Sequence, residues 1–165
     1  MPSFIHKLRV HLDISEPGRE PMKGIVALAP HAGTHSGPET VLDLLNSSSR
    51  VVPVTRPVDG TTVLFTRLQI AWVLAGTEVG QEVVWPGTYR VTKEERVLVE
   101  MEDGSLLAGR IQMELPEDLN RASDFLNGEE DFFPLIARSG IYIINKAKVR
   151  ATQLFEASPL PVKAA

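Results

Sequence analysis

The sequence predicts a mainly β protein of the α+β class, with short helices, built as two tandem β-β-α-β-β-β modules in a pseudo-twofold repeat. Three observations support this prediction: the chain repeats its own features in order, its apolar residues alternate over strand-length segments, and turn residues separate those segments. Five short strands in each module would close into a small barrel, because closure removes exposed strand edges. A sheet covered by the helix is the alternative architecture.

The repeat is anchored by two matching tetrapeptides. Asp43-Leu44-Leu45-Asn46 corresponds to Asp124-Phe125-Leu126-Asn127, and in each copy an apolar pair and a proline follow at the same distance, Val51-Val52-Pro53 and Phe132-Phe133-Pro134. These features share one order and spacing, which indicates duplication of a module of about 80 residues, the size of a small domain. We therefore predict an N-terminal module at residues 1–80 and a C-terminal module at residues 81–165.

The C-terminal module shows its elements most clearly. Asp103-Gly104 is a strong turn signal between two alternating segments, because glycine accepts positive φ. Leu119, Ala122 and Phe125 recur at helical spacing, and Asp118 or Asn120 could cap that helix. The expected order is strands at 97–102 and 109–115, a helix within 116–128, and strands at 132–138, 140–146 and 148–155.

The N-terminal module follows the same plan with a longer first connection. Its first strand is expected at residues 8–14, its second opens at Gly24, and Ser36 or Pro38 marks the start of its helix. Trp72 lies in its last strand, in the core or between the modules.

Composition excludes several classes of function. The 165 residues are 43% hydrophobic with a net charge of −4, so bulk charge attracts neither nucleic acid nor anionic membrane. The absence of cysteine excludes disulfides, thiolate catalysis and cysteine-ligated zinc. We see no signal peptide and no apolar run of membrane-spanning length. A cytoplasmic protein with no membrane contact is expected.

The feature order of Val97–Leu115 together with Phe132–Phe155 resembles the Sm-like fold, a small SH3-like barrel that often assembles into rings. Asp103, Gly104 and Gly109 match the first part of that pattern, but this chain inserts a helix after the second strand. The repeated DFLN…FFPL…INK pattern also resembles a family of bacterial proteins of unknown function. The resemblance implies a fold, and RNA binding is not carried over from it.

Candidate binding residues come from the shared Asp-x-Leu-Asn. Asn46 and Asn127 suit a helix end, because asparagine tolerates left-handed backbone and bonds its own main chain. Asp43 and Asp124 are expected near a helix C-terminus, where the helix dipole disfavours them. A partner such as Arg121 or Arg138 would explain the second aspartate, and a binding role is the alternative.

Basic residues form one further candidate. Lys146, Lys148 and Arg150 alternate, so they would share one face of a strand and could contact phosphate. The outer face of an antiparallel strand has the same appearance. His31 and His35 stand four apart, but Pro30, Gly33 and Pro38 indicate a loop, so we expect no metal site there.

These observations predict a non-catalytic protein-interaction or assembly module that binds a protein partner or itself. No nucleophile–base pair, metal triad or phosphate-binding loop is recognisable, so we predict no catalytic residues, no metal and no cofactor. Sm-like RNA binding through the Lys146, Lys148 and Arg150 face is the alternative function.

Overall fold

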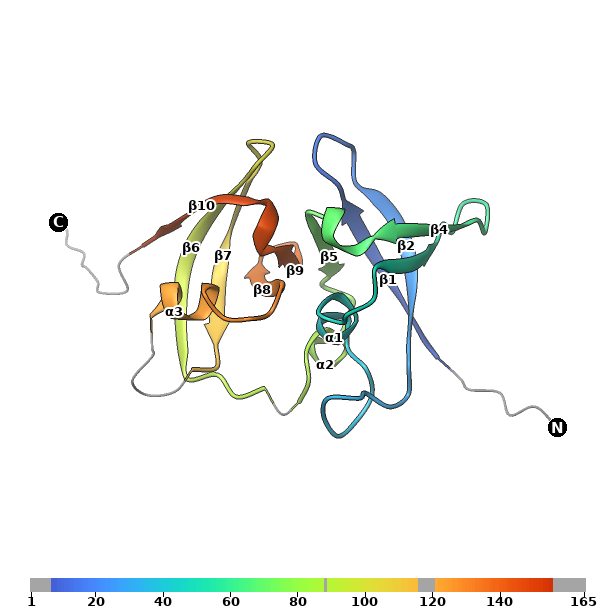
Figure 1. Ribbon diagram of the computed structural model, residues 1–165, viewed down its shortest axis with the longest axis horizontal. Helices are drawn as coiled ribbons and strands as arrows, with labels where there is room; N and C mark the ends of the chain where they lie inside the picture. Colours follow the sequence, from blue (N-terminus) through green and yellow to red (C-terminus); the bar gives the residue numbers. More distant parts are fainter. Residues whose placement is uncertain (1–6, 88, 116–120, 156–165) are drawn as a thin grey trace.

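The computed structural model describes residues 7–87, 89–115 and 121–155, and it consists of one ten-stranded antiparallel sheet (Figure 1). The strand order across the sheet is β10-β6-β7-β8-β9-β5-β1-β2-β3-β4. The strands are β1 (Leu8–Ser15), β2 (Met22–Leu28), β3 (Val51–Thr55), β4 (Thr62–Thr66), β5 (Trp72–Gly76), β6 (Lys93–Met101), β7 (Leu106–Met113), β8 (Phe132–Ala137), β9 (Gly140–Asn145) and β10 (Val149–Leu154). The short helices are α1 (Val41–Leu45), α2 (Gln81–Val84) and α3 (Ala122–Leu126), with 3-10 turns η1 (Arg67–Gln69) and η2 (Lys146–Lys148).

The two halves of the sheet repeat one strand order and one register. The fifth, first, second, third and fourth strands lie side by side in each half, as β5-β1-β2-β3-β4 and as β10-β6-β7-β8-β9. Pro53 pairs with Leu64 in one half, and Pro134 pairs with Ile143 in the other. Leu64 and Ile143 therefore occupy corresponding positions. Comparing pairing partners in this way assigns each strand of one half its counterpart in the other.

The prediction of two closed barrels is wrong. β5 pairs with β1 of its own half on one side, and on the other side with β9 of the second half, from Trp72↔Ile144 to Gly76↔Gly140. Because β9 occupies the edge that closure would need, the sheet continues from one half into the next. The predicted pseudo-twofold relation is also wrong, since the strands that meet at this junction are the fifth of one half and the fourth of the other.

A glycine in the second strand of each half allows the third strand to approach closely. β2 and β3 form a single ladder pair, Ile25↔Thr55, and so do β7 and β8. A Cβ on Gly24 would lie 2.2 Å from Cγ1 of Val54, and one on Gly109 would lie 2.3 Å from the Ile136 carbonyl oxygen. Only glycine permits this approach of the third strand, so the two glycines position β3 and β8 in their halves.

The apolar side chains form two cores that exchange residues across the junction. The first core is built on the N-terminal half but includes Phe132 and Ile143 from the other half. The second core is built on the C-terminal half and includes Ala71 from the first. Trp72 packs edge-on against Tyr142 with ring centroids 5.0 Å apart, so it lies between the halves, one of the two positions expected. The two halves are therefore joined by shared burial as well as by strand pairing.

The helices are shorter than the sequence indicated. α1 begins after Thr40, so Ser36 and Pro38 lie in the preceding loop instead of starting the helix. α3 covers Ala122–Leu126, and the capping candidates Asp118 and Asn120 lie outside the described residues.

Within residues 7–87, 89–115 and 121–155, no helix has the length and hydrophobicity needed to span a bilayer.

Candidate functional site

Asn46 makes a polar contact between the two halves. It ends α1, and its side chain turns toward the first residue of β8. The Asn46 side-chain nitrogen donates to the Phe132 carbonyl oxygen at 3.2 Å, and the Phe132 backbone nitrogen donates to the Asn46 side-chain oxygen at 2.8 Å. The amide therefore takes the place of a neighbouring strand for that residue of β8.

Asp43 lies in the first turn of α1, so its predicted position near a helix C-terminus is wrong. It completes a capping box with Thr40, whose backbone nitrogen donates to Asp43 Oδ2 at 2.8 Å. His35 Nε2 also lies 2.7 Å from the same oxygen, and both side chains are largely buried. A negative charge in this turn is favourable, because the helix dipole is positive at its N-terminus.

The same contacts shift both pKa values. The hydrogen bond to Asp43 raises the pKa of His35 above 6.5. Burial opposes ionisation of Asp43, but hydrogen bonds from His35 and Thr40 outweigh it and lower the pKa of that carboxyl below 3.8. His35 and Asp43 thus form a hydrogen bond, and an ion pair when the imidazole is protonated, that fastens the loop before α1 to the helix. His31, in the same loop, is exposed.

Asp124 and Asn127 occupy the corresponding places in α3. Asp124 is in the first turn, again not near the C-terminus, and it accepts hydrogen bonds from Arg121, the partner suggested by the sequence. The Arg121 contact lowers the pKa of Asp124. Asn127 ends α3 as Asn46 ends α1, but it is exposed and its side chain bonds to no other described residue.

Arg67 and Asn145 add further polar contacts to the junction. The Arg67 guanidinium is buried and donates to the Leu45 and Ser49 carbonyl oxygens, while Nη1 lies 3.0 Å from Asp131 Oδ2 in the other half. Asn145 is fully buried and donates to the Leu68 and Ile70 carbonyl oxygens at 3.0 and 2.9 Å. Sequence reasoning had not assigned either residue to a site.

Lys146, Lys148 and Arg150 do not share a strand face, contrary to the prediction. Lys146 and Lys148 lie in η2, and only Arg150 belongs to β10. The turn forms because the Asn145 side chain accepts from the Ala147 nitrogen, which interrupts the alternation expected of a strand. Arg150 is paired with Glu100, and burial lowers the pKa of Lys146, which donates to the Gly128 carbonyl oxygen. These cations do not form one phosphate-binding stripe.

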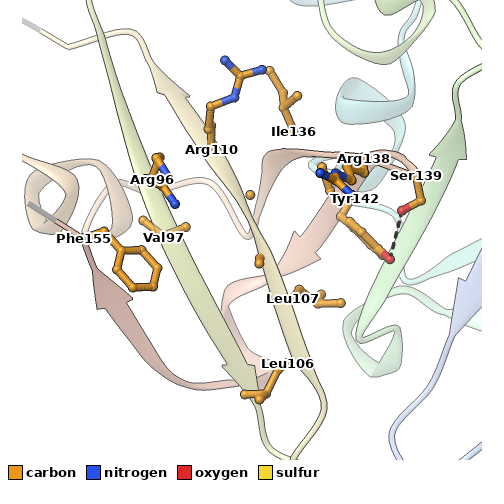
Figure 2. A pocket seen from close by; sticks show the side chains of 13 residues that line it. Arg96, Val97, Leu106, Leu107, Arg110, Ile136, Arg138, Ser139, Tyr142 and Phe155 are labelled. Atoms are coloured by element: carbon orange, nitrogen blue, oxygen red, sulfur yellow. Dashed lines mark hydrogen bonds between the residues drawn. The ribbon is translucent and has the colours of Figure 1, made fainter. Parts of the chain in front are cut away.

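Two of the hollows in the described surface are lined by predicted site residues or by arginines. One, of about 650 Å³, lies between the halves and brings together the predicted residues Asp43, Asn46 and Asp124 with other acidic side chains, Glu39, Glu114 and Glu130. The other lies on the C-terminal half, and its described lining includes Arg96, Arg110 and Arg138 with Tyr142 and Phe155, and no carboxylate (Figure 2). The Arg96 guanidinium lies 5.6 Å from the centre of the Phe155 ring.

The terminal strands β4 and β10 lie at opposite ends of the sheet, and among the described residues no strand pairs with their outer edges (Figure 1). Leu64 of β4 is 60% exposed and Leu154 of β10 is 46% exposed. Leu68 follows β4 and Phe155 follows β10, and both are also exposed. Each free edge thus carries exposed apolar side chains among its polar ones, and an unpaired edge with exposed apolar surface is able to pair with another chain.

Comparison of the chain with protein-family models, with curated proteins and with solved structures finds no match. Among the described residues, no three histidine, aspartate or glutamate side chains are grouped to hold a metal ion. The geometry of the sheet edges and of the junction is therefore the basis for assigning a function.

Proposed function

We propose that this protein is a non-catalytic assembly module that associates with protein through the free edges of its sheet. The observation that carries the proposal is the apolar content of the two unpaired edges, represented by Leu64 on β4 and Leu154 on β10. A natural sheet usually protects such edges with charge, proline or a covering element. Pairing with another chain would satisfy both the main-chain groups and the exposed apolar side chains.

The cytoplasm is the expected location of this assembly. The chain has no cysteine, which fits a compartment where disulfides do not form. The net charge of −4 does not attract an anionic membrane surface.

RNA binding is the second candidate, and the arginine-lined hollow favours it. Arg96, Arg110 and Arg138 surround a surface that also presents Tyr142 and Phe155 (Figure 2). Arginine with aromatic side chains is the combination on which single-stranded bases stack and phosphates bind. Steep loss of affinity for an oligonucleotide between low and moderate salt, reduced further by Arg138→Ser, would support this function.

The proposed function is tested by measuring mass in solution and by disrupting the edges. Sedimentation or light scattering of the purified chain should give a mass above that of one chain as concentration rises. Leu64→Lys combined with Leu154→Lys should reduce that mass to one chain, because each lysine places a charge where the partner strand would pack. Leu106→Lys is the matched control, since Leu106 is 58% exposed but lies in β7, away from both free edges.

A parallel capture from the native host, with and without nuclease, separates the two candidates. Retained proteins that survive nuclease treatment and are lost with the double lysine variant support assembly through the edges. A chain that stays a single copy at every concentration and retains only nucleic acid would overturn the assembly function.

A further inference from the structure

We propose that the partner of each free edge is a second copy of this chain, and that β10 of one copy pairs with β4 of the next in the register that joins β5 to β9. This inference rests on the proposed function and names its partner and geometry. The junction between the two halves serves as the template, because both halves have the same strand order and register.

Correspondence within the sheet identifies which residues would meet. Ile14 of β1 and Val99 of β6 occupy corresponding positions in the two halves. Val73 of β5 pairs with Ile14, and Thr152 of β10 pairs with Val99, so Val73 and Thr152 also correspond. Ile143 of β9 corresponds to Leu64 of β4. Since Val73 pairs with Ile143 at the internal junction, Thr152 of one copy would pair with Leu64 of the next. The neighbouring pair is Gln153 with Val63.

Residues that are buried at the internal junction have counterparts at the free edge of β4 that are exposed. Ile143 has no exposed surface, whereas its counterpart Leu64 is 60% exposed. Phe132 is 1% exposed inside the core of the other half, whereas its counterpart Val51 is 40% exposed. Leu64 and Val51 are thus apolar and exposed in one copy, and the C-terminal half of another copy would bury them.

The surface around α1 that Phe132 contacts also has a counterpart, the surface around α3 in the C-terminal half. Phe132 packs in the first half beside α1, where Leu45 is buried. The counterpart of Leu45 is Leu126 of α3, which is only partly buried. Asn46 holds the backbone of Phe132, and its counterpart Asn127 is exposed with no described partner. In the assembly, Asn127 would hold the backbone of Val51 of the next copy.

Two differences between corresponding residues should make the junction between copies weaker than the junction between the halves. Asn145, which donates to two carbonyl groups, has Thr66 as its counterpart, and a threonine hydroxyl donates only once. The pair of Arg67 with Asp131 becomes Lys146 of one copy facing Arg50 of the next, two positive charges. Reversible, concentration-dependent association is expected, strengthened by salt at this contact.

The pairing is heterologous, because each copy uses a different edge on each side. Such an interface continues from copy to copy until it closes into a ring or extends as a filament. Two copies that used the same edge would instead form a two-fold dimer. Pairing of β10 with β4, instead of two identical edges with each other, therefore distinguishes this arrangement from a two-fold dimer.

Cysteine cross-linking tests the register directly, because the natural chain has no cysteine. Leu64→Cys and Thr152→Cys are prepared as separate proteins with different tags, mixed and oxidised, and Val63→Cys with Gln153→Cys forms a second pair. Directly opposed residues of antiparallel strands meet the distance that a disulfide requires. We expect the mixed product from at least one of these pairs, and much less from Leu64→Cys with Leu154→Cys, which are out of register.

A second measurement uses a gain of association. Arg50→Asp should tighten the assembly about two- to fivefold, because it restores the acidic partner that Asp131 provides to Arg67. Asn127→Ala should weaken it. Both effects should disappear in the Leu64→Lys and Leu154→Lys double variant.

The outcomes distinguish the inference from the function on which it rests. A self-cross-linked Leu64→Cys product without the mixed product would show two-fold pairing of β4, and it would overturn the inference while leaving the assembly function. Multimers with neither product, and with no response to Arg50→Asp, would also overturn the inference alone. A single chain at every concentration, with no captured protein, would overturn both.

Discussion

Asn46 and Phe132 stand 86 positions apart in the chain, yet the Asn46 side chain makes both backbone hydrogen bonds of Phe132. One residue ends a helix of the first half and the other begins a strand of the second. This contact fixes β8 against α1 and carries Phe132 into the core of the first half. Its loss should therefore weaken the union of the halves and not only the helix end.

Replacing Asn46 with alanine should lower the free energy of unfolding by about 1–3 kcal/mol, because the partly buried backbone groups of Phe132 lose their partners. Chemical denaturation at a concentration where the chain is a single copy measures this change. Asn127→Ala is the matched control, since Asn127 ends α3 but is exposed, and its effect should be close to zero. Equal effects of the two variants would contradict the role of Asn46.

Gly109→Ala should destabilise the fold by about 1–3 kcal/mol, the usual cost of forcing extra atoms into a packed site. The added Cβ would lie 2.3 Å from the Ile136 carbonyl oxygen, so β8 would have to move away from β7. Thermal unfolding gives the difference. Gly33→Ala has open space around the new methyl group and should leave stability nearly unchanged.

The ion pair of His35 with Asp43 should make stability depend on pH. Because the folded pKa of His35 is raised above 6.5, the protonated imidazole stabilises the fold fully below that value. This contribution is lost as pH rises through the folded pKa. The difference in unfolding free energy between the natural chain and His35→Gln should therefore shrink as the pH rises from about 5.5 through the folded pKa of His35.

His31→Gln controls for the loss of an exposed imidazole from the same loop. The lower limit of pH stays above the range in which Asp43 itself takes up a proton, since the pKa of that carboxyl is lowered. A difference that grows toward alkaline pH would show that the pair does not stabilise the fold through the charged imidazole.

Arg67→Met should cost about 2 kcal/mol, because it leaves the Leu45 and Ser49 carbonyl oxygens without their charged donor. Asp131→Asn should cost less, since the Asp131 side chain is 49% exposed and water screens its charge. Denaturant titration of both variants measures the two costs. A larger loss from Asp131→Asn would mean that the ion pair, and not the carbonyl contacts, stabilises this side of the junction.

The local elements could be predicted from residues that are close together in the chain. Alternation in Val97, Val99 and Met101 places those side chains on one buried face of β6, and Asp103-Gly104 forms the turn that follows. The matching positions of Asn46 and Asn127 predicted two similar helix ends, and both residues do end a helix. These features depend on residues close in the chain, which is why periodicity and turn chemistry reveal them.

How the elements are joined depends on packing between residues that are far apart in the chain. Main-chain hydrogen bonds carry almost no residue-specific signal, so nothing in β5 shows that its outer edge pairs with β9 instead of closing a barrel. The position of Asp43 at the start of α1 and the burial of Arg67 likewise depend on where the helix begins and on what the other half covers. Which edge meets which is a property of packing across long sequence distances, and it determines what the two free edges remain able to bind.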